Sequence, residues 1–442
     1  MHTTSSNTNK LGVYALGSNS SGQLGVGHAE DVRSTPQRCI FAVEAEADGE
    51  GSADRGARGA GVSPARPPPL RRAHQDRDLD PSLVGHITKI VAGGNHTVVL
   101  TGRGRVFVAG RSGGGLRGDA GDNVFKEVTR EVLEFCPRGV GGEGGVYDES
   151  ITDVAASWDV SFAVVGGRAV VCWGEFGGTC GITAPTTSPT TTTLSTASAT
   201  GTQQMWTSFV LDHTGSRVDV TITAIEAGMA HVVVLLSNGQ VYGWGASRKG
   251  QLGEQYQGQK ILRDARRIDV GPEGRRLLPF APEKVILGRE YTVFLRRDDK
   301  LVTWGSMAGN RDVDAECLFG QDDVAVSGWS SVHVLSRLGG SLSTLVKSMG
   351  KNNHGQFAPA NLPPIRAIAA GSEHCVALTL EGQVIAWGWG EHGNCGEQVD
   401  GKGNVVDRWN VIRLPGLDQR TVVRDVAAGC ATTFVICGED DR

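Results

Sequence analysis

Three histidines of this 442-residue chain stand at matching places in a repeated sequence pattern. His96, His231 and His374 each follow a small-residue turn and precede an apolar run. Three imidazoles around one axis could bind a metal ion, because neutral imidazole is a common metal ligand. The matching residues of four other repeats are Asp159, Tyr291, Val332 and Thr432. Since these do not complete a set of ligands, we expect the histidines to be structural and expect no metal site.

Two short motifs typical of catalysis overlap after one apolar run. Residues 110–114 match Gly-x-Ser-x-Gly, and residues 113–118 match Gly-x-Gly-x-x-Gly. Both motifs need a strand followed by a helix, and residues 119–123 do not begin a helix. Because every repeat has a glycine-rich turn at this place, we interpret both matches as repeat turns. The sequence also lacks a Walker loop and zinc-ligand spacing. We therefore predict a protein that is not an enzyme and uses no cofactor.

Candidate protein-binding residues are aromatic and charged side chains outside the repeated positions. Trp389 lies two residues after a repeat tryptophan, in a turn that also contains charged residues. An exposed aromatic beside charges is typical of a binding hot spot, although packing that holds the turn is the alternative. The predicted partner contacts are Trp389, Glu391, His392, Trp158, Asp159 and Trp329.

Two sequence phrases alternate along the chain and indicate how these residues are positioned. One phrase ends in Trp-Gly or a near equivalent, and the other reads apolar-Ala-Gly-x-x-His before an apolar run. The seven copies of the first phrase end at Gly17, Gly110, Gly174, Gly245, Gly305, Gly350 and Gly388. Regular self-similarity with short β-branched runs and glycine-containing turns predicts repeated antiparallel sheets. The repeat tryptophans, such as Trp244, are expected to pack between these sheets.

The order of the phrases predicts that the repeats close into a ring. The chain begins with a phrase of the first type (residues 12–25) and ends with one of the second type (residues 422–437). If these two halves pair, no sheet edge is left at the end of the array. The sequence thus predicts an all-β fold, a single seven-bladed β-propeller over residues 1–442, closed by its N-terminal and C-terminal strands.

Two long segments interrupt the repeats. Residues 44–81 are rich in glycine, alanine, proline and charged residues, and are expected to be a disordered insertion. Residues 183–204 are rich in threonine and serine and are expected to be a second loop insertion. Insertions at blade ends leave the strand pairing intact, so both are compatible with the propeller.

Composition narrows the possible partners and location. The net charge of −5 gives no support for direct nucleic-acid binding. The nine cysteines contain no C-x-x-C pair, which favours reduced thiols. No apolar run approaches the length of a membrane helix, and the polar first ten residues lack a signal core. We therefore expect a soluble intracellular protein that does not bind membranes.

The alternating phrases resemble the regulator-of-chromosome-condensation (RCC) repeat, and residues 243–253 are a near-complete example. Further segments are similar to the fungal alpha-tubulin suppressor proteins, also called RCC-like killer-toxin-insensitivity factors. These segments are residues 13–19, 23–28, 35–38, 387–396 and 429–433, together with Trp158 and Asp159. The ten-residue run from Trp387 to Gly396 is the most specific of them.

That resemblance implies a binding protein rather than a catalyst. Members of the family form a heterodimer with a small CSL-type zinc-finger protein that carries electrons. The pair supports diphthamide synthesis and Elongator-dependent modification of tRNA wobble uridines. The resemblance therefore implies this zinc-finger partner, possible contact with Elongator, and a location in cytoplasm and nucleus. The two insertions depart from the compact family pattern.

Two alternatives from other functional classes remain open. RCC propellers also serve as guanine-nucleotide exchange factors for small GTPases, and the tubulin name suggests a microtubule-linked scaffold. A basic tail would favour recruitment of an exchange factor to chromatin. The first ten residues hold only Lys10, and the chain ends Glu439-Asp440-Asp441-Arg442. Nucleotide release and microtubule co-sedimentation distinguish these alternatives from the zinc-finger partner.

Overall fold

The structure is a computed structural model. It describes residues 12–42, 85–111, 123–136, 150–175, 192–197, 203–210, 220–299, 301–307, 318–337, 343–416 and 420–439. The predicted insertion at residues 44–81 lies outside these residues.

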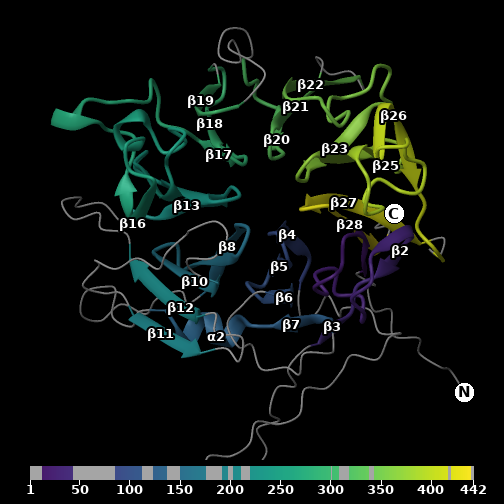
Figure 1. The fold of residues 1–442 in the computed structure, drawn as a ribbon, viewed down its shortest axis with the longest axis horizontal. Coiled ribbons are helices and arrows are strands. Elements are labelled where there is room, and N and C mark those ends of the chain that lie inside the picture. Colours follow the sequence, from purple (N-terminus) through teal and green to yellow (C-terminus); the bar gives the residue numbers. More distant parts are fainter. Residues whose placement is uncertain are drawn as a thin grey trace, which may run out of the picture.

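Seven sheets stand around a central axis, which confirms the predicted seven-bladed propeller (Figure 1). We number the blades 1 to 7 in chain order, starting from the sheet that contains β4. Within each blade the strands are named from the innermost to the outermost. Blade 1 contains β4 (Ile87–Ala92), β5 (His96–Thr101), β6 (Val106–Gly110), β7 (Phe125–Glu127) and β3 (Phe41–Ala42). Blade 2 contains β8 (Ile151–Ala156), β9 (Val160–Val165), β10 (Ala169–Glu175), β12 (Gln203–Val210) and β11 (Thr192–Ala197).

The remaining blades follow the same order. Blade 3 contains β13 (Ile222–Ala227), β14 (His231–Leu236), β15 (Val241–Ala246) and β16 (Ile261–Arg267). Blade 4 contains β17 (Lys284–Leu287), β18 (Tyr291–Leu295) and β19 (Val302–Gly305), and blade 5 contains β20 (Val324–Ser327), β21 (Ser331–Arg337) and β22 (Thr344–Gly350). Blade 6 contains β23 (Ile365–Ala370), β24 (His374–Thr379), β25 (Val384–Trp389) and β26 (Asn404–Ile412). The helical segments within the described residues are short: α2 (Thr129–Glu134), η1 (Glu254–Tyr256) and η2 (Pro272–Gly274).

Blade 7 is built from both ends of the chain, as the order of the phrases predicts. It contains β27 (Thr421–Gly429), β28 (Thr432–Glu439), β1 (Gly12–Gly17) and β2 (Val32–Arg38). The N-terminal strand β1 pairs with the C-terminal strand β28 from Gly12↔Cys437 to Gly17↔Thr432. The two ends of the chain are therefore hydrogen-bonded in one sheet, and the ring is closed.

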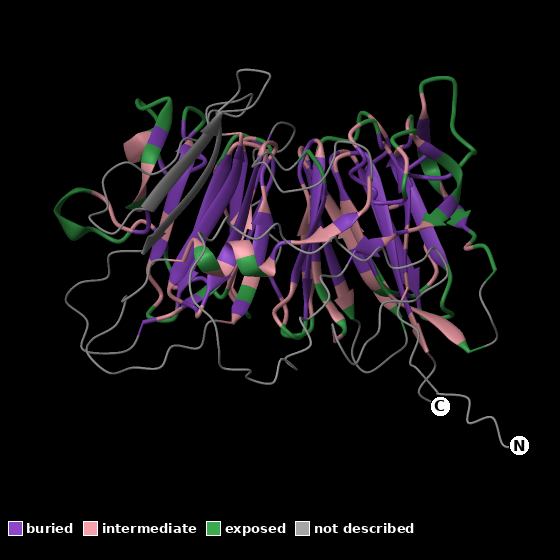
Figure 2. Ribbon diagram, turned by 90° about the horizontal axis from the view of Figure 1, so that it is seen from below, coloured by how far each residue is buried: buried purple, intermediate pink, exposed green. Residues whose placement is uncertain are grey.

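The second strand of each blade forms most of the core. Every residue of β5, β9, β14, β18 and β24 is buried. These strands are covered by neighbouring blades on both sides, so they are buried along their whole length rather than at alternate residues (Figure 2). The repeat tryptophans Trp173, Trp244 and Trp387 are fully buried, as expected for packing between blades. Trp304 is only half-buried and packs its ring on Phe294 of its own blade.

The glycine that ends each copy of the first phrase has one structural role. All seven have a positive φ, between 87° and 139°. A Cβ on each would lie 2.2 to 2.6 Å from the carbonyl oxygen of the residue before the second strand. Only glycine fits this close approach without strain. The glycine recurs in the sequence because the same close backbone contact recurs in every blade.

The predicted loop at residues 183–204 needs correction where the structure describes it. Thr192–Ala197 forms β11, which pairs with β12 and extends blade 2 outward. Threonine is β-branched and favours strands, so the Thr/Ser composition was wrongly interpreted as a loop over these residues.

None of the helices in the described part of the chain has the length and apolar character that a membrane span needs.

Candidate protein-binding face

Turns from two places in every blade lie on the same face of the propeller. Antiparallel strands reverse direction at each step, so the turn after the first strand and the turn after the third emerge together. We call these the inner turns and the outer turns, and the face they share the glycine-turn face. All six predicted partner contacts belong to inner or outer turns or to the strand ends beside them.

Two of the three repeated histidines join neighbouring blades beneath this face. Nε2 of His374 in blade 6 lies 2.9 Å from the hydroxyl of Thr433 in blade 7. That hydroxyl donates to the carbonyl oxygen of Asn394, so Nε2 must donate to Thr433. His231 and Thr292 repeat the arrangement between blades 3 and 4, also at 2.9 Å. His374 and His231 therefore hold neighbouring blades together, whereas both ring nitrogens of the buried His96 lack a hydrogen-bond partner.

Burial keeps these histidines neutral. It lowers the pKa of His374 to about 4 and that of His231 to about 3. Among the described residues, no group of three or more His, Cys, Asp or Glu side chains could hold a metal ion.

The histidine ring explains why small residues form the turn before it, because the ring fills the space that a larger side chain would need. A Cβ on Gly371 would lie 2.3 Å from Cε1 of His374 and 2.4 Å from the carbonyl oxygen of Gly429 in the next blade. Gly93 and Gly228 meet His96 and His231 in the same way. The Ala-Gly-x-x-His phrase is thus a packing unit rather than a ligand motif.

Two of the predicted matches to the histidine position are displaced by one residue. Val160, not Asp159, pairs with the glycine of its third strand as His231 does. In blade 5 the matching residue is Ser331, not Val332. In blade 2, serine replaces the turn glycine at residue 157, so the sequence phrase has no clear register there.

Trp158 and Trp329 occupy the same inner-turn position in blades 2 and 5. Both stand two residues before a second strand, and their rings pack with centroids 5.3 Å apart at an angle of 44°. They line the mouth of a central cavity of about 370 Å³ enclosed by the first strands. Backbone bonds hold the turns in place: the Trp158 amide donates to the Met229 carbonyl at 3.0 Å, and the Trp329 amide to the Ser372 carbonyl at 2.7 Å.

Charged side chains cross the deep part of the cavity. Nζ of Lys89 in blade 1 lies 2.9 Å from Asp153 in blade 2 and 2.8 Å from Glu226 in blade 3. Burial acts to lower the pKa of Lys89, but the two carboxylates outweigh it and the pKa is raised. This lysine therefore stays charged and links three blades across the channel.

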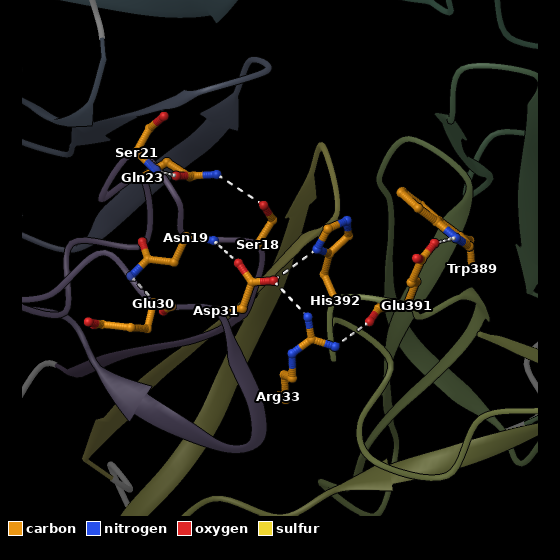
Figure 3. A network of polar contacts seen from close by, with 10 residues as sticks. All are labelled: Ser18, Asn19, Ser21, Gln23, Glu30, Asp31, Arg33, Trp389, Glu391 and His392. Carbon is orange, nitrogen blue, oxygen red and sulfur yellow. Dashed lines mark hydrogen bonds and ion pairs between the residues drawn. The ribbon is translucent and has the colours of Figure 1, made fainter.

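Trp389, Glu391 and His392 lie together at the outer junction of blades 6 and 7 (Figure 3). Nε1 of Trp389 donates to Glu391 at 3.3 Å, and the rings of Trp389 and His392 lie 5.3 Å apart, edge to face. Nδ1 of His392 lies 2.9 Å from Asp31 in blade 7, and Arg33 donates to the Glu391 carbonyl at 2.8 Å. We call Asp31, Arg33, Trp389, Glu391 and His392 the rim cluster.

The rim cluster is positioned by a close contact between two turns. A Cβ on Gly393 would lie 2.2 Å from Cα of Arg33, so glycine lets the blade 6 turn rest on the blade 7 strand. Partial burial acts to raise the pKa of Asp31. Bonds from His392 and the Asn19 amide outweigh that effect and hold the pKa below its usual value. The cluster is an ordered, partly charged surface.

The structure brings the predicted contacts together as two groups on one face. Trp389, Glu391 and His392 belong to the rim cluster, while Trp158 and Trp329 meet at the channel mouth with Asp159 beside Trp158. Sequence reasoning missed Asp31 and Arg33. The predicted pairing of the chain ends was the signal that could have placed them beside the blade 6 turn.

The two motifs typical of catalysis lie mostly outside the described residues. Gly110 is described, ends β6 and has a positive φ of 87°, and its six counterparts also have a positive φ. This residue therefore belongs to the repeat turn, as interpreted from the sequence.

Comparison with known proteins identifies the repeat. A family model described as the regulator of chromosome condensation (RCC1) repeat matches residues 87–115, 222–251 and 365–394. An RCC1 repeat-containing protein of Schizosaccharomyces pombe is 26% identical over 80% of this chain and 91% of its own length. A secretion-regulating guanine nucleotide exchange factor of Bos taurus is 25% identical over 92% of this chain and 79% of its own length.

Solved structures show the same fold. The crystal structure of Prp20p from Saccharomyces cerevisiae has a TM-score of 0.63 at 18% identity, covering 98% of this chain and 92% of that one. The crystal structure of human WBSCR16 has a TM-score of 0.58 at 17% identity, covering 96% of this chain and 99% of that one.

These comparisons correct one prediction and leave another unconfirmed. The prediction that the chain is not an enzyme is wrong: similar proteins, from Bos taurus and from Saccharomyces cerevisiae, are named guanine nucleotide exchange factors, and nucleotide exchange is a catalysed reaction. The special similarity to alpha-tubulin suppressor proteins is not confirmed. What the sequence, the fold and the comparisons establish together is that the chain carries RCC1 repeats and folds as an RCC1-like seven-bladed propeller.

Proposed function

We propose that the protein is a guanine-nucleotide exchange factor for a small GTPase, which it binds with the glycine-turn face. The observation that carries the proposal is the similarity, over 92% of the chain, to a protein named as such an exchange factor. The blade 6–7 side of this face supports it, because an ordered tryptophan stands there among charged residues.

Nucleotide exchange requires an enzyme that binds the nucleotide-free GTPase more tightly than the nucleotide-bound form. A GTPase holds its nucleotide with backbone amides and a lysine that face the phosphates. When the nucleotide leaves, these positive groups are uncompensated. Carboxylates presented by the exchange factor can stabilise that state electrostatically.

The outer turns of blades 6 and 7 provide such carboxylates. They carry Glu30, Asp31, Glu391, Glu397 and Asp400, of which only Asp31 is half-buried and the others are exposed. The outer turn of blade 3 instead presents three exposed cations, Arg248, Lys249 and Lys260, against one exposed carboxylate, Glu254. A face with separated acidic and basic sides favours one docking orientation of a charged partner. We infer that blades 6 and 7 face the nucleotide site.

Release of fluorescent GDP from a panel of purified small GTPases tests the proposal. We expect the full chain to accelerate release from at least one of them by about tenfold or more. The Glu391→Gln variant should lose much of this acceleration. Glu381→Gln is the matched control, because Glu381 is exposed on the same blade but lies in the turn between β24 and β25, on the opposite face. No acceleration with any GTPase, or equal loss in both variants, would contradict the proposal.

The zinc-finger partner, contact with Elongator, the microtubule-linked role and the cytoplasmic and nuclear location stay predictions. Titration calorimetry with the CSL-type protein and co-sedimentation with microtubules at physiological salt would test the first and third of them.

A further inference from the structure

Exposed positive side chains gather along the outer edge of blade 3. The outermost strand of this blade, β16, lies at the periphery of the ring (Figure 1). Seven exposed cations come from the outer turn before β16, from β16 itself and from the turn that follows it. They are Arg248, Lys249, Lys260, Arg263, Arg266, Arg275 and Arg276. We call these seven residues the basic edge.

Few carboxylates balance the basic edge. In this segment, which the structure describes throughout, the exposed carboxylates are Glu254 and Glu273, one in each turn. The buried Asp269 is already bound by Arg267, through bonds of 2.9 and 3.0 Å, and Asp264 is half-buried. The charged groups of the basic edge have no ion-pair partner among the described residues. The edge therefore carries a positive charge that the protein leaves unbalanced, although the whole chain has a net charge of −5.

Protection of the sheet edge would be a simpler role for these cations. Charged residues on an outermost strand discourage pairing with another chain. The outermost strands of blades 6 and 7, however, carry no comparable charge. β26 exposes one residue of each sign, Asp407 and Arg408, and β2 exposes one cation, Arg33. The charge of blade 3 thus exceeds what edge protection requires elsewhere in the same ring.

The geometry of the basic edge fits an extended polypeptide. β16 has seven residues, so its cations follow a line of about 20 Å at the usual rise per strand residue. A segment of similar length in extended conformation would span it. Five of the seven cations are arginines, and a guanidinium binds a carboxylate through two parallel bonds. Arg267 and Asp269 form such a pair within this blade.

Two other kinds of polyanion match the basic edge less well. A nucleic acid or a membrane extends far beyond about 20 Å and would meet the negatively charged remainder of the surface. A membrane-binding surface also needs apolar side chains that insert between lipids. Ile261, with 37% of its surface exposed, is the one large exposed apolar residue of β16.

We propose that the basic edge binds an extended acidic segment of a partner protein, rich in glutamate and aspartate. The segment lies along β16, and its carboxylates accept bonds from the arginines. Complementary charge of this kind contributes to the association rate and to the choice of partner. The three cations of the outer turn also belong to the glycine-turn face, while the other four lie outside it. The test needs no GTPase, so its failure is distinct from failure of the proposed exchange activity.

A pair of peptides that differ only in charge tests this inference. The first is fluorescein-labelled, amidated Gly-Ser-Glu-Asp-Glu-Glu-Asp-Glu-Ser-Gly, and the second has glutamine and asparagine in place of the acids. Binding to the full chain is followed by fluorescence anisotropy. At about 50 mM salt we expect a Kd below about 100 μM for the acidic peptide and at least about tenfold weaker binding of the neutral one. Salt at about 300 mM should weaken binding of the acidic peptide at least about fivefold.

A double variant of β16 locates the site. Arg263→Gln combined with Arg266→Gln should weaken binding of the acidic peptide at least about fivefold. Lys402→Gln combined with Arg413→Gln is the matched control, because it removes two positive charges from exposed positions of blade 6. The control should bind within about twofold of the wild type, since both positions are outside the basic edge.

A second double variant keeps the test decisive if thermal unfolding shows that the first does not fold. Arg275→Gln combined with Arg276→Gln changes the exposed turn after β16 and should weaken binding about threefold. Equal affinity for the two peptides, or equal weakening by the blade 3 and blade 6 variants, would overturn the proposal. Tighter binding of a short DNA duplex or of phosphatidylserine vesicles than of the acidic peptide would also overturn it.

Discussion

Two histidines of blade 6 contact blade 7, and their surroundings are opposite. His374 lies in the buried second strand and reaches the Thr433 hydroxyl. His392 lies in the outer turn, with a third of its side chain exposed, and reaches the Asp31 carboxylate. Both distances are 2.9 Å, so bond length does not distinguish them. The two contacts differ in the group that each imidazole ring meets and in how deeply the ring is buried.

The comparison shows how one junction combines stability with a surface for binding. A proton on His374 would be a buried charge beside a neutral hydroxyl, so burial lowers its pKa to about 4. The Nδ1 atom of His392 meets a carboxylate near solvent. The inner contact is therefore fixed in one state. The outer contact can change its partner without opening the core.

The largest loss of stability is expected from a substitution at the buried contact between His374 and blade 7. In Gly371→Ala, the added methyl would meet the His374 ring and the Gly429 carbonyl, and the carbonyl belongs to backbone that cannot move aside. We expect the free energy of unfolding to fall by about 3 kcal/mol or more, measured by urea denaturation. Gly401→Ala in the same blade is the control, because nothing lies within 4 Å of its Cβ. A loss below about 1 kcal/mol would show that the junction is not tightly packed.

Acid should destabilise the protein through its buried histidines. The pKa of His374 is about 4 when folded and near 6.5 when unfolded, so between these values the unfolded chain binds the extra proton. Stability is therefore complete above pH 6.5 and is lost as pH falls toward 4, by on the order of a few kcal/mol. His96 and His231 act in the same direction.

Replacement of His374 isolates its share of this acid sensitivity. The His374→Gln variant keeps a donor for Thr433, and its unfolding free energy should vary less with pH between 6.5 and 4. Urea denaturation over that range gives both curves. A slope equal to that of the wild type would mean that His374 does not titrate on unfolding as argued.

Removal of Trp389 should separate binding from stability. Its ring lies between His354, at 6.3 Å, and His392, at 5.3 Å, on the surface of the junction. We expect Trp389→Ala to slow the catalysed release of GDP by tenfold or more, as for a hot-spot residue, with only about 1 kcal/mol lost from unfolding. If stability falls and exchange is unchanged, the tryptophan only holds the turn, which is the alternative interpretation from the sequence.

The repeated features of the sequence predicted the fold well because each copy records the same backbone contact. The Trp-Gly glycines, for instance, mark seven equal approaches between strands. Ring closure followed from the order of the phrases. Two positions were misplaced. Ser157 replaces the turn glycine of blade 2, so Val160 was missed as the histidine equivalent, and Ser331 of blade 5 was missed although its turn keeps Gly328.

The candidate site was only partly predictable, because it depends on contacts between distant segments. Trp389, Glu391 and His392 are near one another in sequence and were found. Asp31 is 361 residues from His392, and only the closed ring brings them together. Similarly, nothing in the separate phrases shows that Trp158 and Trp329 meet across the channel. Local patterns identify turns, while closure decides which turns are neighbours.

The smallest effect we expect concerns the outer ion pair itself. Asp31→Asn keeps an acceptor near His392 and Arg33 but removes the charge, and partly exposed pairs contribute less than about 1 kcal/mol to stability. A double-mutant cycle of Asp31→Asn with His392→Gln, measured by urea denaturation, should give a coupling of about 0.5 kcal/mol. Exchange should slow about threefold in either variant, because the carboxylate faces the proposed nucleotide site. A coupling of several kcal/mol would show that the outer contact is structural like that of His374, and the contrast between the two histidines would then be wrong.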